Sequence, residues 1–450
     1  MAAVPGIDEM QNLLNRVKGV FSRGSETLFL CLMTLVLTDY LINRIWWNVK
    51  VPHLDFMMAH IKLTVYLMVL WILALNISVC LFSPTGGEKE ASIWRRICSM
   101  SNARLILILA ACLFGGFALR FILEKSETVY RVVLCTLLIL LACGKNFDKI
   151  VRLFRVLFSG AVGVAALGLL LGYTSSGVKV GAYGTGLALG MTYPNTWARV
   201  FFLAILLCWY DWGQEKPIRT FALFWLAAIP VLLIVKCRTI ALLMILFPVT
   251  VWMKDMVTGR KELQNSVKSH HAQGGRRVLK TLLIAMPFLC FALTLLLCSQ
   301  MELLHKLTYG NYLRNMSKRF VQGGIALKEY GLPLLGKRID LGNNISVVLN
   351  GEMEDLYILD CGYINYGLSR GMIWLFSMMA WQGFANSRCI RNKDYGMLII
   401  GLFMSLLALM EREGFDPWYN PTLLYPLADP LAASVQAVGR DADTAGRGTA

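Results

Sequence analysis

Residues 278–299 read VLKTLLIAMPFLCFALTLLLCS, a run in which Lys280 is the one charged residue. An α-helix needs about 20 predominantly apolar residues to cross the hydrocarbon core of a bilayer. The run therefore predicts a membrane-spanning helix. Similar runs recur along most of the 450 residues, of which 56% are hydrophobic, and the mean hydropathy is +0.56. Soluble domains are about 45–50% apolar, so composition favours one integral membrane domain.

Runs of this kind predict about eleven membrane spans. They lie at residues 27–47, 63–83, 104–122, 128–143, 150–172, 194–210, 219–235, 238–254, 278–299, 356–383 and 395–411. The apolar stretch 418–427 contains Pro421 and Pro426, which favour a broken or re-entrant piece as a partial twelfth span. We therefore expect an all-α fold, a polytopic transmembrane helical bundle over residues 1–428. The tail 429–450 is expected to be disordered or a remnant of cloning.

The basic residues carry a second signal. The formal net charge is +16, but these residues lie between predicted spans rather than in one stripe, which argues against nucleic acid as a partner. With a cytoplasmic N-terminus every inner loop is basic, including the loop 255–278, as the positive-inside rule expects. The external loop 300–355 is basic as well. Its cations are Lys306, Arg314, Lys318, Arg319, Lys328, Lys337 and Arg338. Topology does not require them there, so we expect an anionic ligand outside.

Two shorter outer segments also carry arginine. In the stretch YPNTWAR, residues 193–199, Pro194 suits the first turn of a helix and Asn195 can bond free backbone amides or a sugar hydroxyl. Arg199 would lie about one turn inside the outer boundary, either facing a ligand or as a snorkelling side chain. Arg238 lies in a tight turn between two spans. An arginine at that depth is costly unless it is paired or binds a ligand such as phosphate, although a simple interfacial anchor is the alternative.

The long external loop contains a helical pattern at residues 312–320. Arg314, Lys318 and Arg319 fall near one face of this helix, and Leu313, Met316 and Phe320 are apolar. The helix is therefore amphipathic. It can present clustered cations to a phosphate, or it can lie on the outer leaflet of the membrane.

Acidic residues mark two further places. Asp360 falls inside the predicted span 356–383, where acids are rare and usually functional, so it is either a general base or the partner of an arginine such as Arg238. Tyr363 and Tyr366 follow at a spacing that suits the wall of a polar cavity. The stretch 411–419, EREGFDPWY, ends the last long span near the same outer face. Its aromatic residues can also be ordinary membrane-interface residues.

Other chemistry has no motif in the chain. Twelve cysteines are present without any C-x-x-C spacing, and we interpret them as small apolar residues in helix packing. Walker A and H-E-x-x-H patterns are absent from the sequence. The G-x-S-x-G at residues 367–371 falls inside a predicted span rather than at a strand-to-helix turn, and the D-x-D at residues 441–443 falls in the tail that is expected to be disordered. We therefore expect no metal, no other cofactor and no nucleotide-activated substrate.

Four of these motifs in this order resemble a known family. They are Pro194 to Arg199, Arg238-Thr239, the loop from Arg319-Phe320 to Gly336, and Asp360 to Gly367. Over about residues 150–425 the chain resembles the Wzy-type polysaccharide polymerases of the O-antigen polymerase and ligase superfamily. Members often carry Asp-Asn-x-Tyr where this chain has Asp360-Cys361-Gly362-Tyr363. This departure leaves the role of Asp360 open.

The resemblance implies a metal-independent glycosyltransferase with a helical fold like that of the C class. Such enzymes join oligosaccharide repeat units carried on undecaprenyl pyrophosphate, at the outer face of the bacterial cytoplasmic membrane, alongside a flippase and a chain-length regulator. Arginines would bind the pyrophosphate leaving group and stabilise its charge. Those implied are Arg238 and Arg319 first, then Arg199 and Arg314. The base that takes the acceptor proton would be Asp360 or His305. Asn195, Tyr363 and Tyr366 would contact the glycan.

Three other functions fit the same sequence. A ligase would move a finished glycan to another acceptor. A flippase or transporter of lipid-linked oligosaccharide would require polar residues through several central spans, open alternately to both sides. A non-enzymatic assembly component or receptor is the third. The polar clusters favour the outer half of the bundle, which favours the polymerase.

Overall fold

The computed structural model describes residues 5–45, 64, 68, 71, 126–176, 178–181, 184–212, 217–264, 271–308, 314–337, 339, 346–349, 352–355 and 359–428. Within these residues the chain is mostly helical, with twelve α-helices and two short β-hairpins. The predicted span 104–122 and the tail 429–450 lie outside the described residues, as does all of 63–83 except three single positions.

The helices are α1 (Pro5–Ile42), α5 (Ser126–Leu141), α6 (Phe147–Leu170), α7 (Pro194–Trp212), α8 (Pro217–Leu233), α9 (Arg238–Gln264), α10 (His271–Ser299), α11 (Met301–Thr308), α12 (Arg314–Tyr330), α13 (Gly362–Ser369), α14 (Met372–Arg391) and α15 (Tyr395–Leu407). The hairpins pair β1 (Val178–Gly181) with β2 (Gly184–Leu187), and β3 (Ser346–Leu349) with β4 (Glu352–Asp355). Both are antiparallel; Val178 lies opposite Leu187, and Ser346 opposite Asp355.

Three stretches of described helix are long and apolar enough to cross a membrane, namely Arg23–Ile42, Phe147–Leu170 and Val278–Ser299. Large apolar side chains are also exposed on the outside of the bundle. They include Leu167, Leu170, Trp225, Leu226, Leu233, Leu246, Leu289 and Leu296. Exposed apolar surface on this scale is typical of a protein that contacts lipid.

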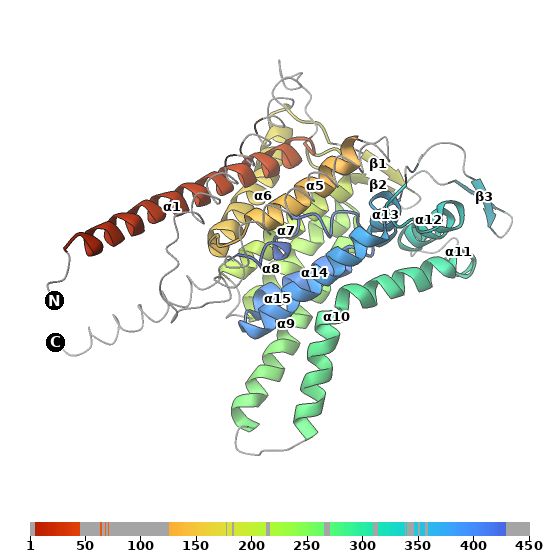
Figure 1. The fold of residues 1–450 in the computed structure, drawn as a ribbon. Coiled ribbons are helices and arrows are strands. Elements are labelled where there is room, and N and C mark those ends of the chain that lie inside the picture. Colours follow the sequence, from red (N-terminus) through yellow and green to blue (C-terminus); the bar gives the residue numbers. More distant parts are fainter. Residues whose placement is uncertain are drawn as a thin grey trace.

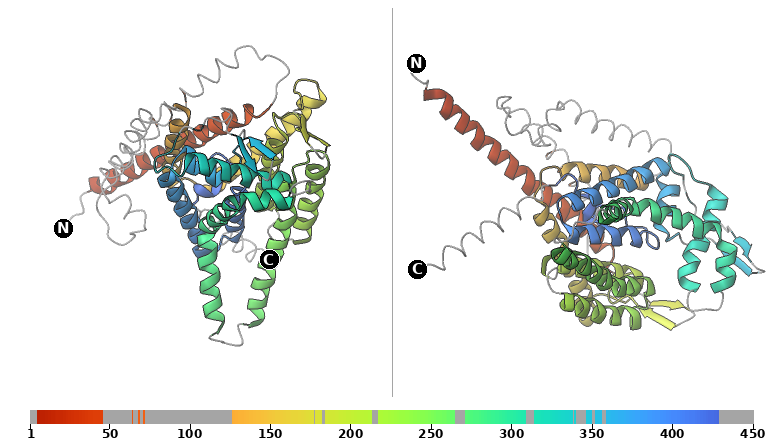
Figure 2. Two further views of the ribbon diagram at one scale, coloured as in Figure 1. Left: turned by 90° about the vertical axis from the view of Figure 1, so that its right-hand side faces the viewer. Right: turned by 90° about the horizontal axis from the view of Figure 1, so that it is seen from below.

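The bundle has two distinct ends. Helices α6 and α7 pack together, as do α8 and α9, and α10 packs along α14 (Figures 1 and 2). The far halves of α9 and α10 extend away from the bundle at one end (Figure 1). The segment with α11, α12 and β3 lies away from that extension. The described parts of the predicted loops 255–278 and 300–355 therefore lie at different ends of the bundle.

The loop 300–355, which is predicted to be external, contains more than an amphipathic helix, because α11, α12 and the β3–β4 hairpin all lie in it. Helix α12 buries its apolar face against the protein through Phe320, Val321 and Ile325. Close approach to α10 depends on glycine: a Cβ at Gly324 would lie 2.5 Å from the Cys298 carbonyl oxygen. The apolar face of α12 is therefore occupied by protein.

The predicted span 356–383 is wrong as one continuous helix. It is divided into α13 and α14, and the break falls at Arg370 and Gly371. The loop 331–337 packs against this break. The Met372 amide donates to the Pro333 carbonyl at 2.9 Å, and the Lys337 amide donates to the Leu368 carbonyl at 2.7 Å. The loop thus satisfies backbone groups that the break leaves without a helical partner.

Gly371 permits this break, and replacing it with alanine is expected to destabilise the protein by about 1–3 kcal/mol. Its φ is +96°, and a Cβ would lie 2.5 Å from the Gly336 nitrogen. Thermal unfolding of the purified protein measures the change. Gly160→Ala is the matched control, because a Cβ there meets nothing within 4 Å inside α6. The control is expected to stabilise by about 0.5–1 kcal/mol. Equal midpoints for the two variants would contradict the argument.

The chain after α15 returns through the bundle without forming a long helix. Residues 411–428 are almost all buried, and their one regular element is a 3₁₀ turn at Pro421–Leu423. The stretch 418–427 is therefore broken, as its two prolines predict. The Asn420 side-chain amide donates to the Gly414 carbonyl at 2.8 Å, and the Trp381 indole donates to the Leu423 carbonyl at 2.7 Å. Irregular backbone needs such partners wherever water is excluded.

Candidate functional site

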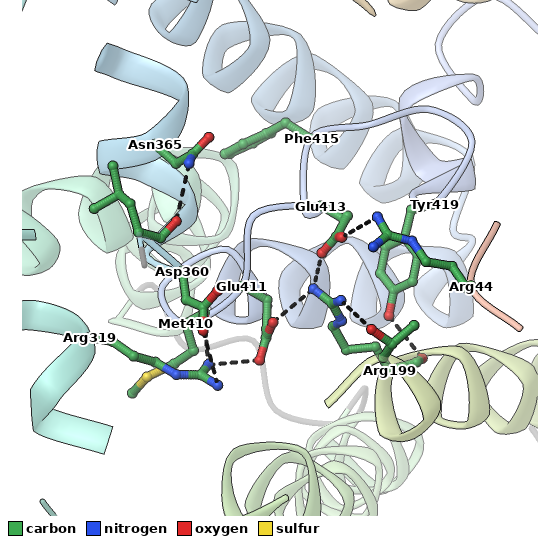
Figure 3. Close-up of polar contacts among 12 residues, drawn as sticks. Arg44, Arg199, Arg319, Asp360, Asn365, Met410, Glu411, Glu413, Phe415 and Tyr419 are labelled. Atoms are coloured by element: carbon green, nitrogen blue, oxygen red, sulfur yellow. Dashed lines mark hydrogen bonds and ion pairs between the residues drawn. The ribbon is translucent and has the colours of Figure 1, made fainter. Parts of the chain in front are cut away.

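Charged side chains gather at one end of the bundle because successive helices begin or end there. Arg44 follows α1, Arg199 is in the second turn of α7, and Arg238 begins α9. Arg319 lies within α12, Asp360 lies two residues before α13, and Glu411 and Glu413 follow α15. Figure 3 shows most of them. The residues are Arg44, Arg199, Arg238, Arg319, Asp360, Glu411 and Glu413. The opposite end of α6 and α7 is marked by the ion pair between Arg155 and Asp211.

Arg199 lies at the centre of this group. Its Nη1 is 2.8 Å from Glu411 Oε2 and also contacts Glu413 Oε2. Glu413 in turn accepts from Arg44 Nη2 at 3.1 Å. The Tyr419 hydroxyl donates to the Arg199 carbonyl at 2.9 Å and fixes the segment after α15 against α7. Arg199 is therefore held in buried ion pairs with two carboxylates.

Arg319 extends the same series from α12. Its Nη1 donates to Glu411 Oε1 at 2.7 Å and to the Met410 carbonyl, while Nη2 lies 3.9 Å from Asp360 Oδ2. Arginine and carboxylate thus alternate from Arg44 to Asp360 (Figure 3). We call this series the ion-pair chain; its members are Arg44, Glu413, Arg199, Glu411, Arg319 and Asp360. Alternation of sign allows each buried charge to be compensated by its neighbours.

Exposure changes along the ion-pair chain. The Glu411 side chain in the middle is 2% exposed, whereas Arg319 is 11% exposed and Asp360 is 24% exposed. An anion arriving from solvent can therefore reach the Asp360 side of the Arg319 guanidinium. Glu411 holds the other side of that guanidinium from within the protein. This solvent-reachable pair, Arg319 with Asp360, is the candidate site.

Burial and charge act in opposite directions on the ionisable groups. Burial alone raises the pKa of the Glu413 carboxyl, but the guanidiniums of Arg199 and Arg44 hold that pKa below its usual value. Burial alone lowers the pKa of Arg319, but the carboxylates of Glu411 and Asp360 hold it above its usual value. Both groups therefore stay charged at neutral pH.

A second ion pair lies deeper, at the break between α13 and α14. Arg370 Nη2 is 2.9 Å from Asp416 Oδ1. Its guanidinium lies over the rings of both Tyr366 and Trp374, 4.5 Å from each ring centre. The pair holds the broken helix to the segment that follows α15. Stacking of this kind stabilises a buried guanidinium.

The two tyrosines predicted to line a polar cavity are core residues instead. Tyr363 is fully buried and donates to the Ser405 carbonyl at 3.2 Å. Tyr366 is buried beneath Arg370. Asp360 also differs from expectation, since it precedes α13 in a non-helical stretch, and its ion-pair partner is Arg319. Asp360 lies outside the helix because α13 begins only at Gly362, and both tyrosines lie on the buried side of this short helix.

The remaining predicted residues surround the candidate site to different degrees. Arg238 is half-buried at the first position of α9. Its neighbour Cys237 lies close enough to Glu411 and Arg319 to experience their charges, so the turn before α9 adjoins the ion-pair chain. Asn195 is half-buried in the first turn of α7, and Arg314 begins α12. His305 is buried on α11.

The sequence motifs do not predict two parts of the ion-pair chain, namely the two glutamates after α15 and the arginine after α1. Glu411 and Glu413 were noted as charges near the outer face, yet they join three arginines from three different elements. Arg44 was absent from the candidates. Carboxylates in an apolar sequence are themselves a signal, because buried acids need cations. The identity of those cations depends on packing.

No family model, curated protein or solved structure matched the chain. Among the residues that the structure describes, no group of three or more His, Cys, Asp or Glu side chains could hold a metal ion.

Proposed function

We propose that this chain polymerises oligosaccharide repeat units carried on undecaprenyl pyrophosphate, at the outer face of the bacterial cytoplasmic membrane. It would be a polytopic protein of about eleven or twelve spans, with a helical fold like that of the C class of glycosyltransferases. The observation that supports this best is the pair of Arg319 and Asp360 at one of the two solvent-reachable ends of the ion-pair chain. It provides an anion-binding cation beside a carboxylate.

A glycosyl transfer from a lipid pyrophosphate needs both groups. As the bond between the sugar and the pyrophosphate breaks, negative charge develops on the leaving phosphate oxygen. Arg319 would stabilise that charge, assisted by Arg238 from the adjoining turn. Asp360 would accept the proton of the acceptor hydroxyl that attacks the anomeric carbon. The pyrophosphate leaves with the electron pair of the broken bond, so the reaction is balanced without an added oxidant or nucleotide.

The rest of the site supports this assignment. Glu411 fixes Arg319 from behind, which reduces the reorganisation needed when a substrate anion arrives. Exposed apolar residues on α8, α9 and α10 would face lipid, where an undecaprenyl chain can approach from the side. Arg199 would act by ordering Glu411 and Glu413 rather than by binding pyrophosphate.

The test is polymerisation by the purified protein of a host repeat unit on its lipid pyrophosphate, without metal or nucleotide. A ladder of products is expected. Arg238→Ala is expected to slow ladder growth by about 10²-fold, through loss of a charge-stabilising donor. Arg412→Ala is the matched control, because Arg412 is an exposed arginine at the same end of the bundle.

Other outcomes identify the competing functions. Movement of the repeat unit across a liposome bilayer without a ladder would overturn the polymerase and favour a flippase. Transfer of a finished glycan to a second acceptor, without chain growth, would favour a ligase. A ladder formed equally well by Arg238→Ala would remove Arg238 from the site.

A further inference from the structure

Two cysteines meet directly behind the candidate site. Cys298 is in the last turn of α10, and Cys361 follows Asp360 and caps the N-terminus of α13. Both are free thiols, and the two thiols lie close enough to interact with each other. Both are buried, and both belong to one apolar cluster with Phe320 and Ile325 of α12. Residues distant in sequence therefore place two thiols in contact.

Helix α12 is shaped to allow this contact. A Cβ at Gly323 would lie 2.8 Å from Cys298 Sγ and 3.9 Å from Cys361 Cβ. Any larger residue at 323 would occupy the space in which the two sulfur atoms meet. Glycine within a helix is less stable than alanine, so its use here needs a packing reason such as this one.

We propose that Cys298 and Cys361 are the site of a disulfide that ties the end of α10 to the residue next to Asp360. The proposal rests on the proposed outward orientation of this end, because disulfides persist on the oxidising side of the cytoplasmic membrane. Bonded sulfur atoms lie about 2.05 Å apart, so the two thiols must approach each other further for the bond to form. The bond would hold Asp360 in a fixed position relative to α10.

The chemistry is a thiol–disulfide exchange. The oxidant is a disulfide of the thiol–disulfide oxidoreductase class. One cysteine thiolate attacks it and forms a mixed disulfide with release of one thiol, and the second cysteine then displaces the other. Two electrons pass from the protein sulfurs to the oxidant, and the two protons end on the released thiols. Because α12 covers both sulfurs in the folded protein, the exchange would take place during folding, before α12 packs.

The experiment uses the full chain expressed in bacterial membranes. Thiols are blocked in denaturant by an alkylating agent without reduction, and chymotryptic peptides are analysed by mass spectrometry. Phe291 lies between Cys290 and Cys298, so this digestion separates the two cysteines of α10. We expect a linked pair of peptides that carries Cys298 and Cys361 and disappears on reduction. Full alkylation of both cysteines without reduction would overturn the proposal.

Variants add a second measurement. Cys298→Ser and Cys361→Ser should each remove the link, whereas Cys290→Ser, a buried neighbour on α10, should keep it. Reduction should lower the thermal midpoint of the wild type by about 5–10 °C and leave the Cys298→Ser midpoint unchanged. If the serine variants do not fold, the linked peptide of the wild type still decides the matter.

The same preparations separate this proposal from the proposed function. A product ladder from protein whose two cysteines are both alkylated would overturn the disulfide alone. A linked peptide in protein that makes no ladder would overturn the polymerase alone.

Discussion

Asp360→Asn is expected to slow chain elongation by about 10²–10⁴-fold, the usual contribution of a general base. Asparagine has nearly the same shape but cannot accept the proton of the acceptor hydroxyl. The fold should be preserved, because Asp360 is the outermost and most distant partner of Arg319, at 3.9 Å, and Glu411 retains its bond to that guanidinium. The measurement is the initial rate of ladder growth by protein in nanodiscs, together with its thermal midpoint.

Glu302→Gln is the matched control for this loss of a carboxylate. Glu302 is exposed on α11 in the same external segment, and its ion pair with Lys328 spans 3.8 Å at the surface. Exposed pairs of this kind contribute little, so we expect wild-type rates. An unchanged rate for Asp360→Asn would show that the carboxylate is not the base. Loss of activity in His305→Asn alone would then assign that role to His305.

Arg199→Ala is expected to lower the free energy of unfolding by about 3–5 kcal/mol, because it leaves Glu411 and Glu413 buried without their shared cation. Loss of one partner from a buried pair is more damaging than loss of both. We therefore expect the double variant Arg199→Ala with Glu413→Gln to recover part of the stability. Thermal unfolding in detergent, followed by intrinsic fluorescence, measures all three proteins.

Arg412→Ala again provides the comparison. Arg412 lies between the two glutamates in sequence but is exposed, so its loss should change stability by no more than about 0.5 kcal/mol. Similar midpoints for Arg199→Ala and Arg412→Ala would show that the ion-pair chain is not a stabilising element. If Arg199→Ala keeps normal stability but loses polymerisation, Arg199 would instead be assigned to substrate binding.

The ion-pair chain gives one physical reason for both expectations. Its centre is buried and compensated, so changes there act on folding, while its Asp360 end reaches solvent, so changes there act on chemistry. Glu411 connects the two, because it bonds to Arg199 on one side and to Arg319 on the other. A folding defect and a catalytic defect should therefore be separable by position along the chain.

Much of the helical framework follows from the sequence. Length and hydropathy predicted helices close to α6, α7, α8 and α10, because a helix that faces lipid must be apolar over its whole length. Pro421 and Pro426 predicted that the last apolar stretch would be broken, since proline cannot continue a helix. The basic residues and the position of Asp360 predicted that the functional residues lie in the half of the bundle expected to face outward.

The pairing of charges was decided only by the tertiary structure. The sequence could not show that Arg319 would reach Asp360 and Glu411, because these residues meet through the packing of α12 against the segment after α15. Nor could it show the break at Gly371, which depends on the loop 331–337 packing against it. Hydropathy determines which segments leave water, whereas the partner of each buried charge depends on which helix ends are brought together.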